Sequence, residues 1–257
     1  MSGMRSHFYK SIHAYTTKAA LISKPPQQTF DYLSPTTTYL LETSLATHLL
    51  LSPLSYHVDS PLPPGYHLLY FPSPDLEQAL SKDGYSSYFA PEGYNRRLWI
   101  GGSIEFSKEP IRLGNMANCT EAVERIIERN DKAMVWTSRN IKQGESWITE
   151  ERGLYYSNEK YHAIQPLKLS DTKDFENVVH FTPTQILLSR FAGLSFNAHK
   201  IHVDADYAKL EGYPTTLLPG PLSVIILCCR NPQPYRRLVY RCIAPCFMGM
   251  HLRLAWK

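Results

Sequence analysis

The stretch GLSFNAHKIHVDADYAKLEGYPTTLLPGPL, residues 193–222, holds two histidines three positions apart, His199 and His202, with Asn197 before them and Asp204 after them. Three kinds of structure fit such a group: a metal site, a catalytic base with its helper, or a polar turn between buried elements. Histidines at this spacing need one or two further ligands to hold a metal, and no Cys, Asp or Glu cluster of ligand spacing stands out. No metal is therefore expected, and the flanking residues must help to choose between the other two.

A helix is predicted just before the histidines. Thr182 is its expected N-cap, Pro183 its first residue, and Gln185 the partner that reaches back in a capping box. Apolar residues then recur at helical spacing at Leu187, Phe191 and Leu194.

A second short helix is predicted just after them. Asp204 is expected to cap residues 205–211, and Gly212 to end the helix. His199 and His202 are therefore expected in an irregular connection between two helices, where side chains can be aimed.

Gly220 lies between Pro219 and Pro221 and so carries the only backbone N–H of that triplet. The run LSVIILCC at 222–229 follows; it is apolar on every side and belongs inside a domain. A helix there would present the Gly220 N–H at its positive end, facing the same pocket as a histidine. Because three β-branched residues lie in the run, a buried strand is the alternative.

The composition excludes several classes of protein. A chain of 257 residues, 43% hydrophobic and 19% charged, suits one large globular domain or two smaller ones. The net charge is +4 and the 27 Lys and Arg are dispersed, so no nucleic-acid partner is expected. No apolar run approaches the roughly 18 to 20 residues of a membrane span. The five cysteines have no framework spacing, which predicts reduced thiols in a reducing compartment: Cys119, Cys228, Cys229, Cys242 and Cys246.

Residues 1–28 contain four basic residues, no acidic residue and many Ser and Thr, which is the composition of a mitochondrial transit peptide. A leader that targets nothing, in a cytosolic protein, is the alternative.

From residue 29 strand patterns dominate: residues 66–71, 97–106, 133–141 and 153–157 are predicted strands, and 121–129 a helix. Gly101 and Gly102 indicate a bulge, a close backbone approach or an irregular loop. The polar stretch 168–180 divides the chain into halves at 29–167 and 168–257.

At residues 193–222 the sequence resembles the MaoC-like hydratase and dehydratase family, and more closely its mitochondrial type 2 hydroxyacyl-thioester dehydratases, which carry F-N-x-H-K/R-I-H; it is also similar to mesaconyl-C4-CoA hydratases. DYLSPTTTYLLETSL, LPPGYHLLYFPSPDL and NRRLWIGGSIEF are similar to the first half of those proteins. The resemblance implies an α+β double hot-dog fold, an antiparallel sheet wrapped around a central helix in each half, with the acyl chain in a tunnel between the halves. The final segment, VYRCIAPCFMGMHLRLAWK, leads to the expectation that the second half is short of its last strands.

The activity implied by the resemblance is that of a hydro-lyase: dehydration of 3-hydroxyacyl thioesters, or the reverse hydration, in mitochondrial fatty-acid synthesis or a related pathway. No cofactor is expected, and the partner is a thioester of acyl carrier protein or of coenzyme A; a homodimer is compatible with this assignment. In the broader pattern D-x-N-P-x-H, the aspartate position falls on Asn197 and the asparagine position on His199. Pro219 stands where many members have histidine.

The chemistry assigns roles to individual residues. His202 is the expected base, since imidazole transfers protons near neutral pH. Asn197 cannot ionise and is expected to position the hydroxyl or water, and the Gly220 N–H to hold the thioester oxygen. His199, Asp204 and Pro221 are expected to support the site or bind substrate. A non-catalytic acyl-thioester binding pseudoenzyme and a hot-dog thioesterase remain alternative functions.

Overall fold

The computed structural model describes residues 19–52, 54–163, 175–230 and 234–256. Its main sheet is antiparallel, with six strands in the order β1-β3-β4-β5-β2-β7. These strands are β1 (Gln27–Tyr32), β2 (Arg96–Phe106), β3 (Met116–Arg129), β4 (Lys132–Gln143), β5 (Ser146–Ser157) and β7 (Arg237–Arg241). A separate antiparallel pair joins β6 (Asn177–Phe181) to β8 (Leu252–Trp256).

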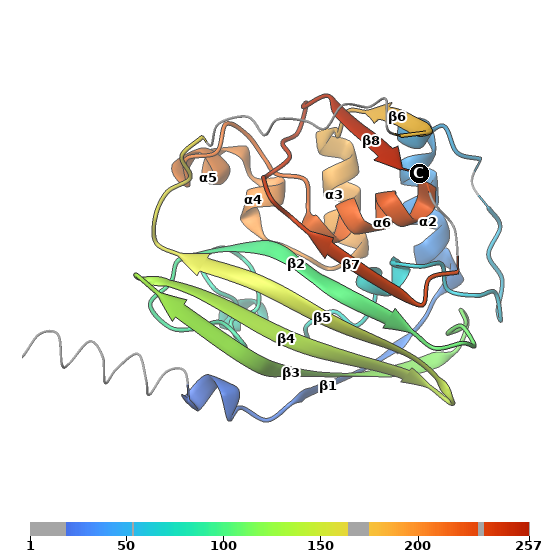
Figure 1. Ribbon diagram of the computed structural model, residues 1–257, viewed down its shortest axis with the longest axis horizontal. Coiled ribbons are helices and arrows are strands. Elements are labelled where there is room, and N and C mark those ends of the chain that lie inside the picture. The colour runs from blue at the N-terminus through green and yellow to red at the C-terminus, as the bar shows by residue number, and fades with distance from the viewer. Residues whose placement is uncertain (1–18, 53, 164–174, 231–233, 257) are drawn as a thin grey trace, which may run out of the picture.

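Helices fill the space between the two sheets. In Figure 1, α2 (Pro35–Leu49), α3 (Gln185–Leu194) and α6 (Gly220–Arg230) lie between the six-stranded sheet and the β6–β8 pair. Two short helices, α4 (Lys200–Val203) and α5 (Ala205–Leu210), and two 3₁₀ turns, η1 (Tyr66–Leu69) and η2 (Glu77–Ala79), complete the described elements. The α+β double hot-dog prediction is confirmed, with α2 and α6 as the central helices of the two halves.

The largest of three hydrophobic clusters joins the halves. Pro35 starts α2, as its fixed φ suits a first helical turn, and Leu41, Leu45 and Leu49 form a stripe that is wholly buried. The same core takes in buried side chains of the sheet, of α3 and of α6. Each fully buried leucine stabilises the fold by about 1.5–3 kcal/mol relative to an exposed one.

The apolar run after Pro219 is the helix α6, so the helical prediction is confirmed and the buried strand is wrong. Five of its side chains are buried: Leu222, Val224, Ile225, Ile226 and Cys228. The helix is stable in this position because most of its apolar side chains pack into the core, and this burial outweighs the weak helix propensity of its β-branched residues.

The second half is tied to the first where β7 pairs with β2. The register of β2 against β5 shifts between Trp99 and Gly101, which confirms the bulge. A Cβ at Gly101 would lie 2.5 Å from the Tyr240 carbonyl oxygen, and one at Gly102 would lie 2.0 Å from that of Glu151. Both glycines therefore permit a close backbone approach on the two sides of β2.

The predicted helix at 121–129 is wrong, because these residues belong to β3 and pair with β4; Glu121 also pairs with Gln27 of β1. A bulge between Val123 and Arg125 adds one residue to the strand. It places the buried Val123 and Ile126 three positions apart, which imitates helical spacing. Pairing with β4 along this whole segment decides the structure against the local pattern.

Two other local predictions are wrong. Residues 66–71 begin with η1 and not a strand, since a short, continuously buried apolar run carries no period that separates the two. Helix α3 begins at Gln185, two residues later than the Thr182 cap implied; the Thr184 hydroxyl accepts the Leu187 N–H at 3.2 Å. The strands predicted at 97–106, 133–141 and 153–157 are confirmed as parts of β2, β4 and β5.

The predicted leader and the predicted division between the halves lie partly on residues that the structure does not describe. Residues 1–18 of the predicted leader, 164–167 at the end of the predicted first half and 168–174 of the predicted division between halves are not among the described residues. Within 19–28, Leu21 is buried and β1 already starts at Gln27, so this part belongs to the folded first half. All five cysteines are free thiols. No helix in the described ranges has the length and apolar character needed to cross a membrane.

Candidate active site

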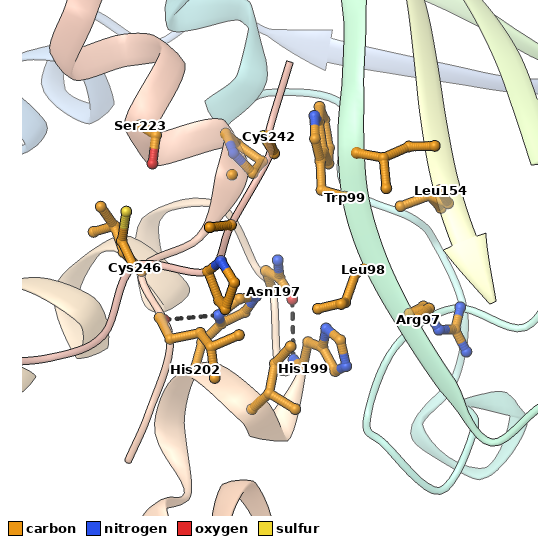
Figure 2. A pocket seen from close by; sticks show the side chains of 18 of the residues that line it. Arg97, Leu98, Trp99, Leu154, Asn197, His199, His202, Ser223, Cys242 and Cys246 are labelled. Atoms are coloured by element: carbon orange, nitrogen blue, oxygen red, sulfur yellow. Dashed lines mark hydrogen bonds between the residues drawn. The ribbon is translucent and has the colours of Figure 1, made fainter. Parts of the chain in front are cut away.

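A cavity of about 220 Å³ opens between α4, the start of α6 and strand β2. Five of the six predicted site residues line it: Asn197, His199, His202, Gly220 and Pro221. Figure 2 shows Asn197, His199 and His202 gathered on one side, across from the strand that carries Arg97, Leu98 and Trp99.

His202 lies in the single turn of α4, not in an irregular connection as predicted. Its Nδ1 is 2.9 Å from the Leu217 carbonyl oxygen. Because that oxygen can only accept, Nδ1 carries the proton and Nε2 keeps its lone pair. Burial lowers the pKa of His202 to about 4, although the bond to Leu217 acts in the opposite direction. At neutral pH the side chain is therefore an uncharged base with a defined tautomer.

Asn197 is held by its backbone and by its side-chain oxygen. Its N–H donates to the Ala192 carbonyl at 2.9 Å, and its Oδ1 accepts the His199 N–H at 3.0 Å. The side-chain amide nitrogen has no hydrogen-bond partner among the described residues and lines the cavity. Asn197 thus offers a fixed N–H donor to a bound molecule.

The His199 ring lies behind Asn197, only 6% exposed, with its Nε2 3.4 Å from Asp83 Oδ2. Asp83 in turn accepts from Arg97 Nε at 2.8 Å. Burial, with help from His202 and Arg97, keeps the pKa of His199 well below its ordinary value. His199 is therefore neutral and supports the site. Within the described ranges, no three His, Cys, Asp or Glu side chains are grouped to hold a metal ion.

Gly220 is the first residue of α6, and its N–H donates to no described group. A Cβ there would lie 2.9 Å from Cγ of Trp99, so the backbone and the indole are in close contact. The amide therefore stands at the positive end of α6, on the wall of the cavity.

Asp204 was predicted to support the site or to bind substrate. It does not line the cavity, so the structure does not support a contact between Asp204 and the substrate. Its Oδ1 accepts the N–H groups of Asp206 and Tyr207, as predicted for the cap of α5. It therefore holds the helix that follows His202.

Sequence reasoning missed the contribution of the first half. Asp83 and Arg97 are more than a hundred residues from His199 and carry no motif in common with it. The available signal was the Asp83-Gly84 turn: Gly84 has φ +81, and a Cβ there would lie 2.4 Å from the Ala198 carbonyl oxygen. The turn thus packs directly against the segment that carries Asn197 and His199.

Solved structures share this fold. A MaoC-like dehydratase from Phytophthora capsici superposes with a TM-score of 0.67 at 14% identity, covering 92% of this chain and 87% of that one. A second MaoC-like dehydratase gives 0.65 at 16% identity. At such identities the likeness concerns the fold, which is that of the MaoC-like class.

Sequence comparison narrows the class. The model of the hydroxyacyl-thioester dehydratase type 2 family matches residues 65–248, and the chain belongs to this family. It is 31% identical, over 87% of both chains, to the mitochondrial hydroxyacyl-thioester dehydratase type 2 of Schizosaccharomyces pombe. It is 35% identical to the mesaconyl-C(4)-CoA hydratase of Chloroflexus aurantiacus, over 66% of this chain and 64% of that one.

Proposed function

We propose that the protein dehydrates 3-hydroxyacyl thioesters and, in reverse, hydrates enoyl thioesters. The observation that supports this most directly is that one cavity is lined by a neutral His202, by Asn197 with its free side-chain amide and by Gly220 with its free N–H. Names of the relatives, a hydroxyacyl-thioester dehydratase and a hydratase, support the same reaction.

In dehydration His202 Nε2 takes the proton from C2, and the bond from C3 to the hydroxyl breaks. The proton returns to the departing hydroxyl, so that one water molecule leaves and a carbon-carbon double bond forms. Charge that develops on the thioester oxygen is held by the Gly220 N–H, while Asn197 orients the hydroxyl. The backbone N–H of His199 holds Asn197 Oδ1 in place, and the ring of the same residue lies against Asp83.

An absorbance assay tests the proposal. The protein is mixed with crotonyl and 3-hydroxybutyryl thioesters of acyl carrier protein and of coenzyme A, and enoyl absorbance and free thiol are both followed. Reversible loss and gain of enoyl absorbance is expected. Release of thiol would point to a thioesterase, and binding without either change to a pseudoenzyme; both results would overturn the proposal.

The pH dependence is a second test. His202 acts as the neutral base, and burial lowers its pKa to about 4, so kcat/KM should stay high down to that region and fall only as the pH passes through it. Asn197→Asp places a carboxylate beside the imidazole, which favours its charged form and should move this acid limb to higher pH with part of the activity kept. Asn140→Asp, on the exposed face of β4, should leave the limb unmoved. A limb near pH 6.5 in the parent protein would contradict the assignment of the base.

We also propose that the protein acts in mitochondria. The composition of residues 1–28 and the mitochondrial names of two relatives support this. Because residues 19–28 belong to the folded first half, a cleavable leader would end before Ala19. A reporter joined to residues 1–18 should enter mitochondria; a diffuse cytosolic signal would argue for the alternative.

A further inference from the structure

A second cavity, of about 790 Å³, lies against the inner face of the main sheet. It continues from the site of His202, because six residues line both cavities: Tyr85, Arg97, Trp99, Leu154, Asn197 and Pro221. Its other walls are the segment from Leu68 to Ala90 and the end of α3. On the proposed function, this is the space that receives the acyl group.

The wall of this cavity changes from apolar to polar along the sheet. Val135 and Leu154 face each other across β4 and β5, and the next inward pair is Thr137 with Arg152. Two residues of a strand span about 7 Å, so the polar pair lies a short distance beyond the residues shared by both cavities. An acyl group that extends from Asn197 along the sheet would reach it.

Thr137 has a hydroxyl without a partner. The side chain is 2% exposed, lines the cavity, and its Oγ1 makes no hydrogen bond with any described residue. A buried hydroxyl is normally satisfied, because leaving it unpaired forfeits the bonds that water would make. The unpaired Thr137 hydroxyl therefore indicates that a bound group forms a hydrogen bond with it.

Arg152 supplies a second donor. Its Nε and Nη2 donate to Glu150 at 2.9–3.0 Å, while Nη1 has no hydrogen-bond partner among the described residues. Its guanidinium also lies over the ring of Trp99, 4.5 Å from the centroid. Burial lowers the pKa of Arg152, but Glu150 and Glu121 are among the groups that raise it, and the net shift is upward, so the group stays charged.

The neighbouring charges leave these donors available. Arg139 forms ion pairs with Glu150 at 3.2 Å and with Glu121 at 3.3 Å. The carboxylates of Glu121 and Glu150 are thus paired with arginines. Neither of them accepts a hydrogen bond from the Thr137 hydroxyl or from Arg152 Nη1. A neutral hydroxyl and a charged N–H, both free, best fit an acceptor with two oxygens.

We propose that the acyl group handled at His202 carries a carboxylate at its far end, bound by Thr137 Oγ1 and Arg152 Nη1. The substrates would then be monothioesters of short dicarboxylic acids. This inference rests on the proposed function for the reaction, but the binding of the far end can be measured without it.

The test compares pairs of trans-2-enoyl thioesters of equal length, one ending in a carboxylate and one in a methyl group, with four, six and eight carbons. At one length or more the parent protein should prefer the carboxylate by about tenfold or more in kcat/KM. Thr137→Val keeps the shape and removes the hydroxyl, and should reduce this preference about tenfold, the usual effect of losing a bond to a charged group. Thr137→Ser should restore it, and Thr149→Val, on the opposite face of β5, should change nothing.

A preference for the methyl-terminated member at every length, or a preference that Thr137→Val does not alter, would overturn the inference and leave the proposed reaction intact. Turnover of no thioester would instead count against the proposed function. In that event calorimetric titration of saturated thioesters, again carboxylate-terminated against methyl-terminated, decides the inference with the same variants. Tighter binding of the carboxylate form that is lost in Thr137→Val supports it, and equal binding refutes it.

Discussion

Replacing His202 by alanine should lower kcat/KM for hydration of an enoyl thioester by about a thousandfold, within the range that general acid–base catalysis contributes. Among the described residues that line the cavity there is no second neutral base fixed in the same way, because His199 is turned to Asp83 and buried. The fold should survive, since the loss is one side chain and its bond to the Leu217 carbonyl. Steady-state kinetics on the purified variant, with circular dichroism, gives the result.

His57→Ala is the matched control, as this histidine is exposed on a loop of the first half and should leave the rate unchanged. If His202→Ala keeps a tenth or more of the activity, His202 is not the base. If a chelator abolishes the activity of the parent protein and zinc restores it, the reaction runs through a metal and the assignment of the histidines must change.

Gly220→Pro should lower kcat/KM by about a hundredfold more than Gly220→Ala does. Both variants place a Cβ against Trp99, where the contact would be 2.9 Å, and therefore share that contact. Only the proline removes the N–H that is proposed to hold the thioester oxygen, and loss of one such donor typically costs two to three orders of magnitude. Proline is accepted at the first position of a helix, so α6 should persist.

The two variants are compared by kcat/KM and by thermal unfolding, which reports any shared loss of packing. Equal rates for Gly220→Pro and Gly220→Ala, in two folded proteins, would show that the N–H takes no part. The oxyanion would then need another donor, and the free amide of Asn197 would be the next to examine.

The sequence was sufficient to predict those elements whose structure depends on residues that are neighbours in the chain. The cap at Asp204 and the helix after Pro219 could be predicted because the determining residues are neighbours in the sequence. The predicted helix at 121–129 failed because a bulge, which depends on pairing with β4, altered the spacing of buried residues. Bulges and pairings of this kind are tertiary and leave little trace in a local pattern.

The site residues show the same contrast between what neighbouring residues determine and what tertiary contacts determine. Asn197, His202 and Gly220 could be found because they lie in one stretch, and the resemblance of that stretch to a family assigned them to one pocket. Asp83 and Arg97 could not be found, since nothing in their own neighbourhood refers to His199. Thr137 and Arg152 were missed for a related reason: each stands in an ordinary strand pattern, and only the register of β4 on β5 sets them side by side.

The contact of β7 with Gly101 and Gly102 has a consequence for how the chain folds. The two strands come from positions more than half the chain length apart, whereas β3, β4 and β5 follow one another and pair as neighbours. Contacts between distant positions close large loops and form slowly. The sheet of the first half can therefore assemble early, while the docking of β7 onto β2 comes late. Cys242, which follows β7, is part of the wall around His202, so an intermediate halted before this docking has a sheet but an unfinished catalytic pocket.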